Sequence, residues 1–405
     1  MGHPRRRVAL VVPGLQYGGG VPTVALFLYR LLESTDRYEP ALVSLSIASN
    51  DALSVLLLNP STWKRGVQMT VGTWRGLPVT YVGACLAELE FQRFRPRRAL
   101  TELLEPFDLI QMIAGTPAVG MAVARVWKPR CLFAATTIRR ERVSLLAEAR
   151  GLWRLWRRLM TAINAWNEPR ALQLMDHVFA LSQYTQSQLA PNVPPSKLSL
   201  GWPGVDVDLF HPAEAPPVDG YILSVGRFGD PRKNVRLLLQ AYRQLRENLP
   251  DAPRMMLVGE HPRPGDWEKA VQWGIAQRID VRVNVEPGLL PSLVRQAALF
   301  VLPSDEEGLG IVILEAMASG LPVVSTRCGG PETCVMEGVT GYLTPVGDAE
   351  ALAQRMQMLL ADRALGQRMG RAGRRLVETR FSIRAAGKPF LQVYDRLLGG
   401  ADELP

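Results

Sequence analysis

The chain has 405 residues, of which 47% are hydrophobic and 21% are charged, and its formal net charge is +9. This length exceeds what one hydrophobic core usually supports, so we expect two folded domains, with disorder only at the ends. The basic excess favours binding of phosphates, whether on nucleic acid, anionic lipid or a nucleotide, and composition cannot choose among these.

Cysteine and histidine usage argues against disulfides and metal sites. The four cysteines have no Cys-x-x-Cys spacing, so we expect reduced thiols in a cytoplasmic protein. The four histidines are scattered singly, and neither a metal nor another cofactor is expected. The apolar run after the arginines at 5–7 is too short for a signal peptide, and no stretch approaches the roughly 20 apolar residues of a membrane span.

Strand and helix patterns alternate through the first half. Residues 8–12 are a short apolar run, the glycines Gly18, Gly19 and Gly20 follow, and residues 21–32 have apolar positions at helical spacing. This order predicts a strand, a glycine turn and a helix, which open a βα unit. Further strands are predicted at residues 40–47, 79–82, 109–113, 131–136 and 177–181.

A proline-dense stretch marks the expected domain boundary. It contains Pro212, Pro216 and Pro217 and has no sustained apolar period, which is typical of segments between domains. We therefore predict an N-terminal domain over residues 1–204, a linker over 205–217 and a C-terminal domain over 218–384.

The second half shows a more regular alternation. Strands are predicted at residues 221–225, 255–258, 279–283, 298–302 and 322–326. Helices are predicted at 234–249, with Asn234 as the N-cap, at 266–276, from 291, and at 310–319. Short apolar strands that alternate with helices indicate a parallel sheet covered on both faces, and such sheets bind ligands beyond the carboxyl ends of their strands.

Two cations follow the strand predicted at 221–225. Arg227 and Lys233 can converge on a diphosphate, the arginine through its bidentate guanidinium and the lysine as a point charge. For a random pair of basic residues, solvated surface charge is the better interpretation. Their position at the carboxyl end of a strand shifts the balance modestly towards a ligand site.

The segment from Glu307 to Glu315 is a more specific signal. Gly308 and Gly310 allow the backbone to approach a ligand and precede a helix whose N-terminus suits a phosphate. Glu315 lies eight residues after Glu307, about 12 Å along a helix, which suits one carboxylate at a sugar and the other at ribose hydroxyls. Alternatively, Glu307 pairs with the helix dipole and Glu315 is a surface residue, although a carboxylate in so apolar a helix needs a partner.

These residues resemble the family 4 glycosyltransferases, retaining enzymes of the GT-B fold. The resemblance is close over residues 204–348 and looser before them. Residues 307–318 look like the family's Glu-x7-Glu signature, and supporting matches lie at 225–227 with Lys233, at 257–260, at 329–332 and at 347–348. The resemblance implies an α/β protein with two Rossmann-like parallel-sheet domains facing a central cleft, and a final helix over 385–405 packing back on the N-terminal domain.

The resemblance also implies roles for individual residues. Arg227 and Lys233 would hold the donor diphosphate and stabilise the charge that develops on it as it departs. Glu307 would position the donor sugar, and Glu315 would bind the ribose. The remaining donor contacts would come from backbone at Gly308, Leu309 and Gly310, at Gly19 and Gly20, and near Val285 and Glu286.

Two departures from the family pattern concern the hinge and the acceptor side. The family's Asn-Gly-Val-Asp motif reads Pro203-Gly204-Val205-Asp206 here. A histidine that many members place near the transferred sugar is replaced by the stretch Thr137-Ile138-Arg139. We expect Arg139 on the acceptor side, where it suits an anionic group on donor or acceptor.

The predicted function is transfer of a sugar from a UDP- or GDP-sugar to a glycan, lipid-linked or small-molecule acceptor, without a metal. A nucleotide-sugar epimerase of the same architecture is one alternative, and a non-catalytic nucleotide-sugar-binding protein is another. The glycines at 18–20 lack the spacing of a dinucleotide fingerprint, which argues against a nicotinamide enzyme. Nucleic acid is not an expected partner, since it would not explain the segment from Glu307 to Glu315.

Two basic segments are candidates for binding an anionic membrane surface. Residues 150–166 mix tryptophan and arginine at helical spacing, and a second run contains Arg93, Arg95, Arg97 and Arg98. Both could dock the first domain on an anionic membrane near a lipid-linked acceptor, at the inner face. The alternative is a tryptophan stripe that faces the core and a solvated arginine face, and the sequence leaves both open.

Overall fold

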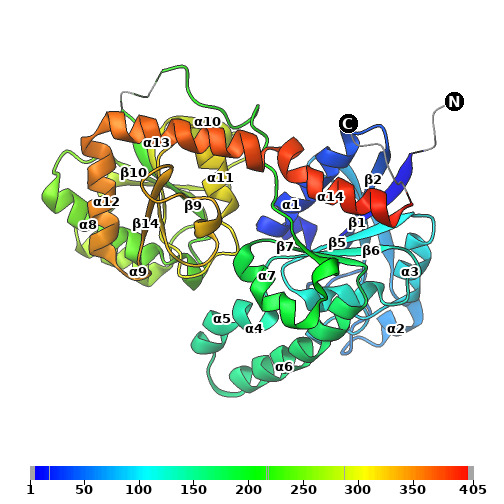
Figure 1. The fold of residues 1–405 in the computed structure, drawn as a ribbon. Helices are drawn as coiled ribbons and strands as arrows, with labels where there is room; N and C mark the ends of the chain where they lie inside the picture. The colour runs from blue at the N-terminus through cyan, green and yellow to red at the C-terminus, as the bar shows by residue number, and fades with distance from the viewer. Residues whose placement is uncertain (1–4, 18, 216, 218, 287, 400–405) are drawn as a thin grey trace. The chain divides into compact units, whose positions relative to one another are not determined.

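The computed structural model describes residues 5–17, 19–215, 217, 219–286 and 288–399. The chain divides into two compact domains (Figure 1). The first comprises Met1–Gly204 and Ala386–Pro405, and the second comprises Val205–Ala385. Each is built on a largely parallel sheet, as the alternating strand and helix patterns predicted.

The first domain contains, among the described residues, an eight-stranded sheet in the order β3-β4-β2-β1-β5-β6-β7-β8. All neighbours pair in parallel except β3 and β4, which form an antiparallel hairpin. The strands are β1 Arg6–Pro13, β2 Tyr38–Leu45, β3 Met69–Trp74, β4 Leu77–Val82, β5 Leu109–Ala114, β6 Arg130–Ala134, β7 His177–Ala180 and β8 Leu198–Leu200. Chain order reverses at β1, between β2 and β5, which makes this the sheet's topological switch point.

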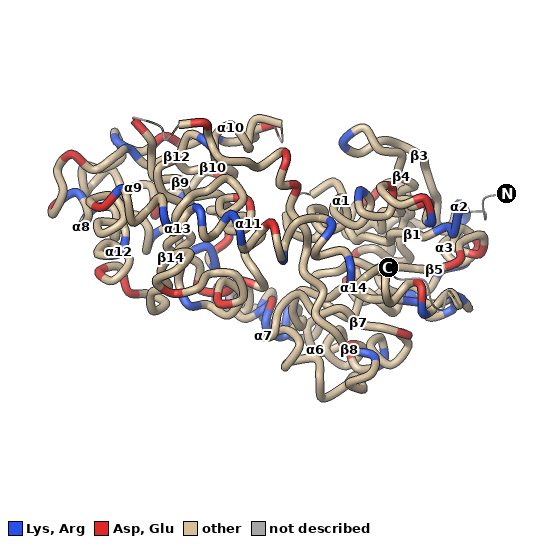
Figure 2. Tube along the Cα trace, turned by 45° about the horizontal axis from the view of Figure 1, so that its top comes forward, with Lys and Arg blue, Asp and Glu red and all other residues tan. Residues whose placement is uncertain are grey.

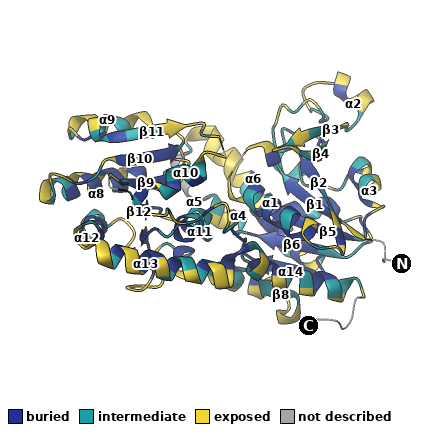
Figure 3. Cartoon of the chain, turned by 90° about the horizontal axis from the view of Figure 1, so that it is seen from above, coloured by how far each residue is buried: buried dark blue, intermediate teal, exposed yellow. Residues whose placement is uncertain are grey.

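Helices cover both faces of this sheet. On one face, Ala9 and Val11 of β1 share a core with Leu100 of α3 and Leu172 of α6. The central strands are buried on both faces and are therefore apolar almost throughout (Figure 3). The helices are α1 Gly20–Glu33, α2 Ser61–Arg65, α3 Arg98–Leu104, α4 Ile138–Glu141, α5 Val143–Glu148, α6 Gly151–Gln173 and α7 Gln183–Leu189.

The end of the last helix, α14 (Ile383–Leu397), packs on the other face of the first sheet. The Phe390 ring lies 5.8 Å from that of Phe27 and 4.2 Å from that of Phe179, centroid to centroid. The buried hydroxyl of Tyr394 donates a hydrogen bond of 2.7 Å to Oε1 of Gln111 on β5. The C-terminal segment thus completes the core of the N-terminal domain, while residues 400–405 lie outside the described part of the chain.

The second domain contains, in the described chain, a six-stranded parallel sheet in the order β11-β10-β9-β12-β13-β14. Its strands are β9 Tyr221–Gly226, β10 Met255–Gly259, β11 Ile279–Val283, β12 Ala297–Leu302, β13 Val323–Thr326 and β14 Gly341–Thr344. Its helices are α8 Val235–Asn248, α9 Pro264–Gln272, α10 Leu290–Arg295, α11 Ile311–Ala318, α12 Ala349–Ala361 and α13 Arg363–Leu376. The switch point lies between β9 and β12, so the loops after these two strands meet at one edge.

The segment predicted as a linker is anchored at its start to the second domain. The backbone N–H of Val205 donates to the carbonyl of Phe381 at 2.7 Å. Nη1 of Arg374 on α13 donates to the carbonyls of Val207 and Phe210 at 2.9 and 2.7 Å. These bonds fix the chain immediately after Gly204, so the second domain begins earlier than the proline content suggests.

Most predicted elements agree with the structure to within a few residues. The predicted N-cap of α8 is confirmed, because Oδ1 of Asn234 accepts the N–H of Leu237 at 3.1 Å. The hairpin strand β3 was not predicted. It carries exposed Met69 and Val71, and its turn uses Arg75 with a positive φ, where asparagine or aspartate would give the usual signal.

Lysines and arginines are interspersed with acidic residues over both domains (Figure 2). The net charge of +9 therefore does not gather in one stripe. Within the described chain, no helix combines the length and the apolar character needed to cross a bilayer.

We expect Tyr394→Phe to lower the free energy of unfolding by about 1–3 kcal/mol, because Gln111 keeps a buried oxygen that has lost its donor. Thermal or urea unfolding of the full chain measures this. Tyr17→Phe, at an exposed tyrosine, serves as the control and should leave stability unchanged. Equal stability of the two variants would contradict a structural role for this bond.

Candidate functional site

Two strand-end loops are tied together at the switch point of the second sheet. The backbone N–H of Asp305, after β12, donates to the carbonyl of Arg232, after β9, at 2.7 Å. Nδ2 of Asn234 donates to Oδ1 of Asp305 at 2.7 Å. The hydroxyl of Thr326, at the end of β13, also donates to the carbonyl of Ser304. Three neighbouring strand ends therefore position one set of loops.

An ion pair between Lys233 and Glu307 lies at this junction. Nζ of Lys233 is 2.5 Å from Oε1 of Glu307, and the side chains are only 18% and 12% exposed. The hydroxyl of Ser304 donates to the same carboxylate oxygen at 2.8 Å. The structure thus brings together two residues that are 74 positions apart in sequence and that were both predicted as site residues.

Arg227 lies beside this pair and is more open to solvent. Its side chain is 52% exposed, and its guanidinium is 3.7 Å from the carboxylate of Asp230. Burial opposes ionisation of Asp230, but hydrogen bonds from Arg232 and the charges of Arg232 and Arg227 outweigh it and lower the pKa of Asp230. The ionised Asp230 therefore orients two guanidinium groups at the rim of the loop.

The helix α11 begins directly after the Glu307 loop. Its N-cap is Gly310, which has a left-handed backbone with φ of 80° and no side chain to cap the helix. The first N–H groups of a helix lack intrahelical acceptors and carry the positive end of the dipole. These donors and the two cations are features that suit an anionic group.

Close backbone packing holds the Glu307 loop in place. Glu307 forms an isolated parallel bridge with Gly329, which follows β13. A Cβ on the next residue, Gly330, would lie 2.4 Å from the backbone nitrogen of Leu309 and 2.6 Å from the carbonyl oxygen of Glu307. Only glycine fits this contact.

Glu315 differs in one respect from the prediction. The spacing of about 12 Å assumed a helix from one glutamate to the other, but residues 307–310 form a loop and α11 begins at Ile311. Glu315 is half-buried on α11 and is not without a partner. The helical argument therefore gives no distance between the two carboxylates.

Cys328 borders the same loop. Its carbonyl accepts the N–H of Glu307 at 3.4 Å. Burial raises the pKa of the Cys328 thiol to about 12, and the neighbouring carboxylates of Glu307 and Glu332 add to this shift against opposing effects of Thr326 and Lys233. The thiol is protonated at neutral pH and is a poor nucleophile.

The predicted base-binding residues follow the edge strand β11. Val285 is half-buried and Glu286 is exposed, and the carbonyl of Glu286 accepts the N–H of Leu289 at 2.9 Å. Because β10 separates β11 from β9, these residues lie two strand positions from the Lys233 loop.

In the first domain, the glycines after β1 lead into α1. Gly19 is the N-cap of α1 with φ of 98°, its carbonyl accepts the hydroxyl of Thr23 at 3.1 Å, and Gly20 is the first helical residue. Gly18 lies outside the described residues. The predicted backbone contact is thus at the carboxyl end of β1, the strand where chain order reverses.

Arg139 lies after β6, on the short helix α4, and its side chain is exposed. The N-terminus of α4 is held by Glu168 of α6, whose Oε1 accepts the backbone N–H of Ile138 at 2.8 Å. Burial raises the pKa of Glu168 to about 7, the bond from Ile138 opposes this, and Glu141 adds to it. Glu168 was not predicted, and it positions the loop that carries Arg139.

The basic run at 93–98 is largely structural, in contrast to the membrane hypothesis. Nε and Nη1 of Arg93 donate to the carbonyls of Ala87 and Ile47 at 2.6 and 2.5 Å. Arg97 is buried, donates to the carbonyl of Arg93 at 2.8 Å, and has its pKa lowered to about 10 by burial. These two guanidinium groups bind backbone carbonyls inside the domain, so they do not face a membrane.

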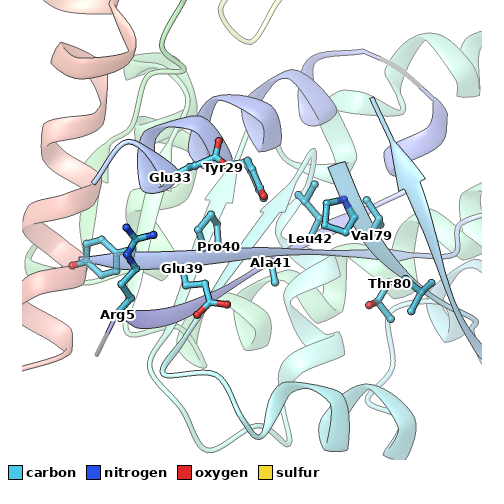
Figure 4. A pocket seen from close by; sticks show the side chains of 12 residues that line it. Arg5, Tyr29, Glu33, Glu39, Pro40, Ala41, Leu42, Val79 and Thr80 are labelled. Carbon is cyan, nitrogen blue, oxygen red and sulfur yellow. The ribbon is translucent and has the colours of Figure 1, made fainter. Parts of the chain in front are cut away.

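A hollow in the first domain lies near the amino ends of strands β2 and β4 (Figure 4). It is lined by Tyr29 and Glu33 at the end of α1 and by Glu39 and Pro40 at the start of β2. Parallel sheets bind ligands at the carboxyl ends of their strands, so this hollow is separate from the predicted site. Among the described residues, no group of three or more His, Cys, Asp and Glu is placed to hold a metal ion.

Several supporting residues were missed by sequence reasoning. Ser304 and Asp305 are polar residues that come directly after a buried strand, the same signal that identified Arg227. Gly330 lies in the family match at 329–332, but the sequence alone predicts no function for it. For Glu168 the sequence offers no such signal, because its partner Ile138 is 30 residues away on another element.

Solved structures with this fold are similar over nearly the whole chain. Sucrose-phosphate synthase from Thermosynechococcus elongatus has a TM-score of 0.70 at 20% identity and covers 98% of this chain and 100% of its own. HepE from Anabaena, in complex with UDP, has a TM-score of 0.70 at 17% identity and covers 96% and 100%. The two Rossmann-like domains therefore have the GT-B fold.

Residues 219–362, in the second domain, match the family model Glycosyl transferases group 1. A GDP-mannose-dependent alpha-(1-6)-phosphatidylinositol monomannoside mannosyltransferase of Mycolicibacterium smegmatis is 34% identical over 221 residues, 49% of this chain and 56% of that protein. Sulfoquinovosyl transferase SQD2 of Arabidopsis thaliana is 32% identical over 211 residues, 47% and 38%. The chain spans about half the length of these curated relatives. The second domain is therefore similar to the group 1 glycosyl transferases.

We expect Gly330→Ala to displace the Glu307 loop, because the added methyl group meets backbone atoms that have no room to move. Gly330 has φ of −81°, so the alanine backbone itself is unstrained. Gly265→Ala is the matched control, since its Cβ meets nothing within 4 Å. Calorimetric titration with UDP and GDP should show binding lost in Gly330→Ala and kept in Gly265→Ala; equal binding would refute the packing argument.

We expect Glu168→Gln to remove a pH dependence of stability. The carboxyl titrates near pH 4.5 in the unfolded chain and near 7 in the folded one, so its stabilising contribution is present below pH 4.5 and is lost as pH rises through 7. The loss is on the order of 3 kcal/mol. Unfolding of wild type and Glu168→Gln from pH 4 to 8 measures it, with exposed Glu105→Gln as control; parallel curves for wild type and Glu168→Gln would exclude the effect.

Proposed function

We propose that this protein transfers a sugar from a nucleotide-diphosphate sugar, a UDP- or GDP-sugar, to an acceptor. The observation that carries the proposal is the buried Lys233–Glu307 pair at the N-terminus of α11. The pair holds a cation, which suits a phosphate, beside a carboxylate, which suits sugar hydroxyls. It lies at the topological switch point of the second sheet. The match of residues 219–362 to group 1 glycosyl transferases supports the same activity.

The cations of this site would stabilise the departing diphosphate. An ammonium has three N–H donors, so Lys233 can keep its bond to Glu307 and still donate to a phosphate oxygen. Exposed Arg227 would add a bidentate contact, and the N–H groups at Gly308, Leu309 and Gly310 would face the charge that develops. With these positive groups in place, we propose that the reaction needs no metal.

Glu307 would position the donor sugar through its hydroxyl groups. Its two described side-chain contacts both use Oε1, which fixes the carboxylate while Oε2 would accept from the sugar. Glu315 would bind the ribose. Backbone near Val285 would contact the base, and Gly19 and Gly20 would contribute backbone from the first domain.

We further propose retention of the anomeric configuration, as the Glu-x7-Glu signature implies. The acceptor would attack on the face that the leaving diphosphate vacates, with Arg139 on the acceptor side. The Mycolicibacterium smegmatis relative is named for GDP-mannose and a phosphatidylinositol monomannoside, and HepE was solved with UDP-glucose. These names favour a hexosyl donor and a glycan or lipid-linked acceptor.

A cytoplasmic location is part of the proposal. The thiols of Cys85, Cys131, Cys328 and Cys334 are free, the form that reducing compartments maintain.

A thermal-shift screen of UDP, GDP, ADP and their sugars identifies the donor, since a ligand that binds only the folded protein raises its melting temperature. Nucleotide release with the best donor then reports transfer or hydrolysis. No shift and no turnover with any donor would overturn the proposal.

We expect Lys233→Ala to weaken nucleotide-diphosphate binding about 10- to 100-fold, because a charge-assisted bond to phosphate is lost. Glu307→Gln should bind UDP or GDP much as wild type does, yet lose turnover, because its target is the sugar. Exposed Lys269→Ala and Glu247→Gln in the same domain are the matched controls. Near-normal turnover of both site variants with every donor would exclude these roles.

A further inference from the structure

The first two turns of α6 project from the first domain. Residues 151–159 are all exposed, whereas buried side chains begin at Met160 and continue with Asn164 and Glu168. At 1.5 Å per residue the 23-residue helix is about 35 Å long, so a considerable length is unsupported by the core. In Figure 1 it runs beside α4 and α5.

The exposed part of α6 carries an apolar stripe. Leu152, Leu155, Trp156 and Leu159 have the i, i+3, i+4, i+7 spacing that places side chains on one face of a helix. All four are exposed; Leu152 is 83% accessible, and adjacent Trp153 is 71% accessible. The tryptophans therefore do not face the core, and the core-facing alternative left open by the sequence is wrong.

The rest of this helical surface is basic. Arg154, Arg157 and Arg158 lie on the sides away from the stripe, and Arg150 precedes the helix. The sequence from 149 to 167 contains no aspartate or glutamate. Tryptophan and leucine on one face with arginine on the other is the pattern of helices that lie in a membrane interface.

We propose that the N-terminal part of α6, residues 151–159, docks on an anionic lipid bilayer. The leucines and tryptophans would enter the boundary between headgroups and acyl chains, where tryptophan is favoured. Arg154 and Arg158 would contact lipid phosphates, whereas Arg157 donates to the backbone carbonyl of Leu145 at 3.3 Å. A second copy of the chain is a poorer occupant, because pairing two such helices brings their arginines together without carboxylates to neutralise them. The proposal does not depend on the transferase activity.

The apolar part of the proposal is tested by sedimentation of the full chain with vesicles of phosphatidylcholine and phosphatidylglycerol, against phosphatidylcholine alone. Wild type should bind the mixed vesicles at low salt. Trp153→Ser with Trp156→Ser should abolish binding, whereas Trp127→Ser, at a 94% exposed tryptophan elsewhere in the domain, should not. All these side chains are exposed, so melting temperatures should not change.

The basic part is tested by Arg154→Gln with Arg158→Gln, which should weaken binding to the mixed vesicles about 30-fold, since each arginine contacts the anionic surface. Arg368→Gln with Arg371→Gln, on exposed positions of α13, makes the same change in net charge and should have little effect. Absence of wild-type binding, or equal losses in test and control variants, would overturn the proposal. A concentration-dependent dimer that the tryptophan variants abolish, without vesicle binding, would assign the stripe to a second copy instead.

Discussion

The ion pair between Lys233 and Glu307 is the constraint on which the second-domain site depends. Both side chains are mostly removed from water, so each charge is stabilised by the other. The pair also joins loops from two strands between which the chain order reverses. A parallel sheet brings these strand ends together by topology, and the ion pair with its Ser304 support converts that proximity into a fixed arrangement.

Glycines make this arrangement possible by letting backbones approach where side chains would collide. Gly330 fits against the backbone of the Glu307 loop, and a Cβ on Gly259, at the end of β10, would lie 2.2 Å from the carbonyl oxygen of Gly226. The loop ends therefore lie against each other through main-chain atoms, and polar side chains such as Lys233 remain directed at the junction. A single glycine in a sequence motif carries little information by itself. At Gly330 and Gly259, however, a Cβ would collide with backbone atoms, which explains why glycine is required.

The sequence predicted the features that follow from periodicity and from strand ends, and it failed where long-range packing decides. Apolar runs identified the central strands, and Arg227, Lys233 and Glu307 were recognised because they follow such runs. The edge strand β3 has no buried face to produce a pattern, and the anchoring of Val205 depends on Phe381, which is distant in sequence. The spacing between Glu307 and Glu315 was also misread, since residues 307–310 form a loop and α11 begins only after Gly310, whose backbone is left-handed.

Arginine shows most clearly why composition alone misleads. Arg93 and Arg97 belong to a basic run, yet they bind backbone carbonyls inside the first domain, so their charges are used for folding. The arginines of α6 belong to a run of similar composition, but there the neighbouring leucines and tryptophans point to solvent. The two basic segments differ in where their apolar side chains point. Exposing a continuous stripe of large apolar side chains does not stabilise the fold, so such a stripe marks a binding surface. A basic segment therefore indicates a binding surface only when the apolar side chains beside it are also exposed and not packed in a core.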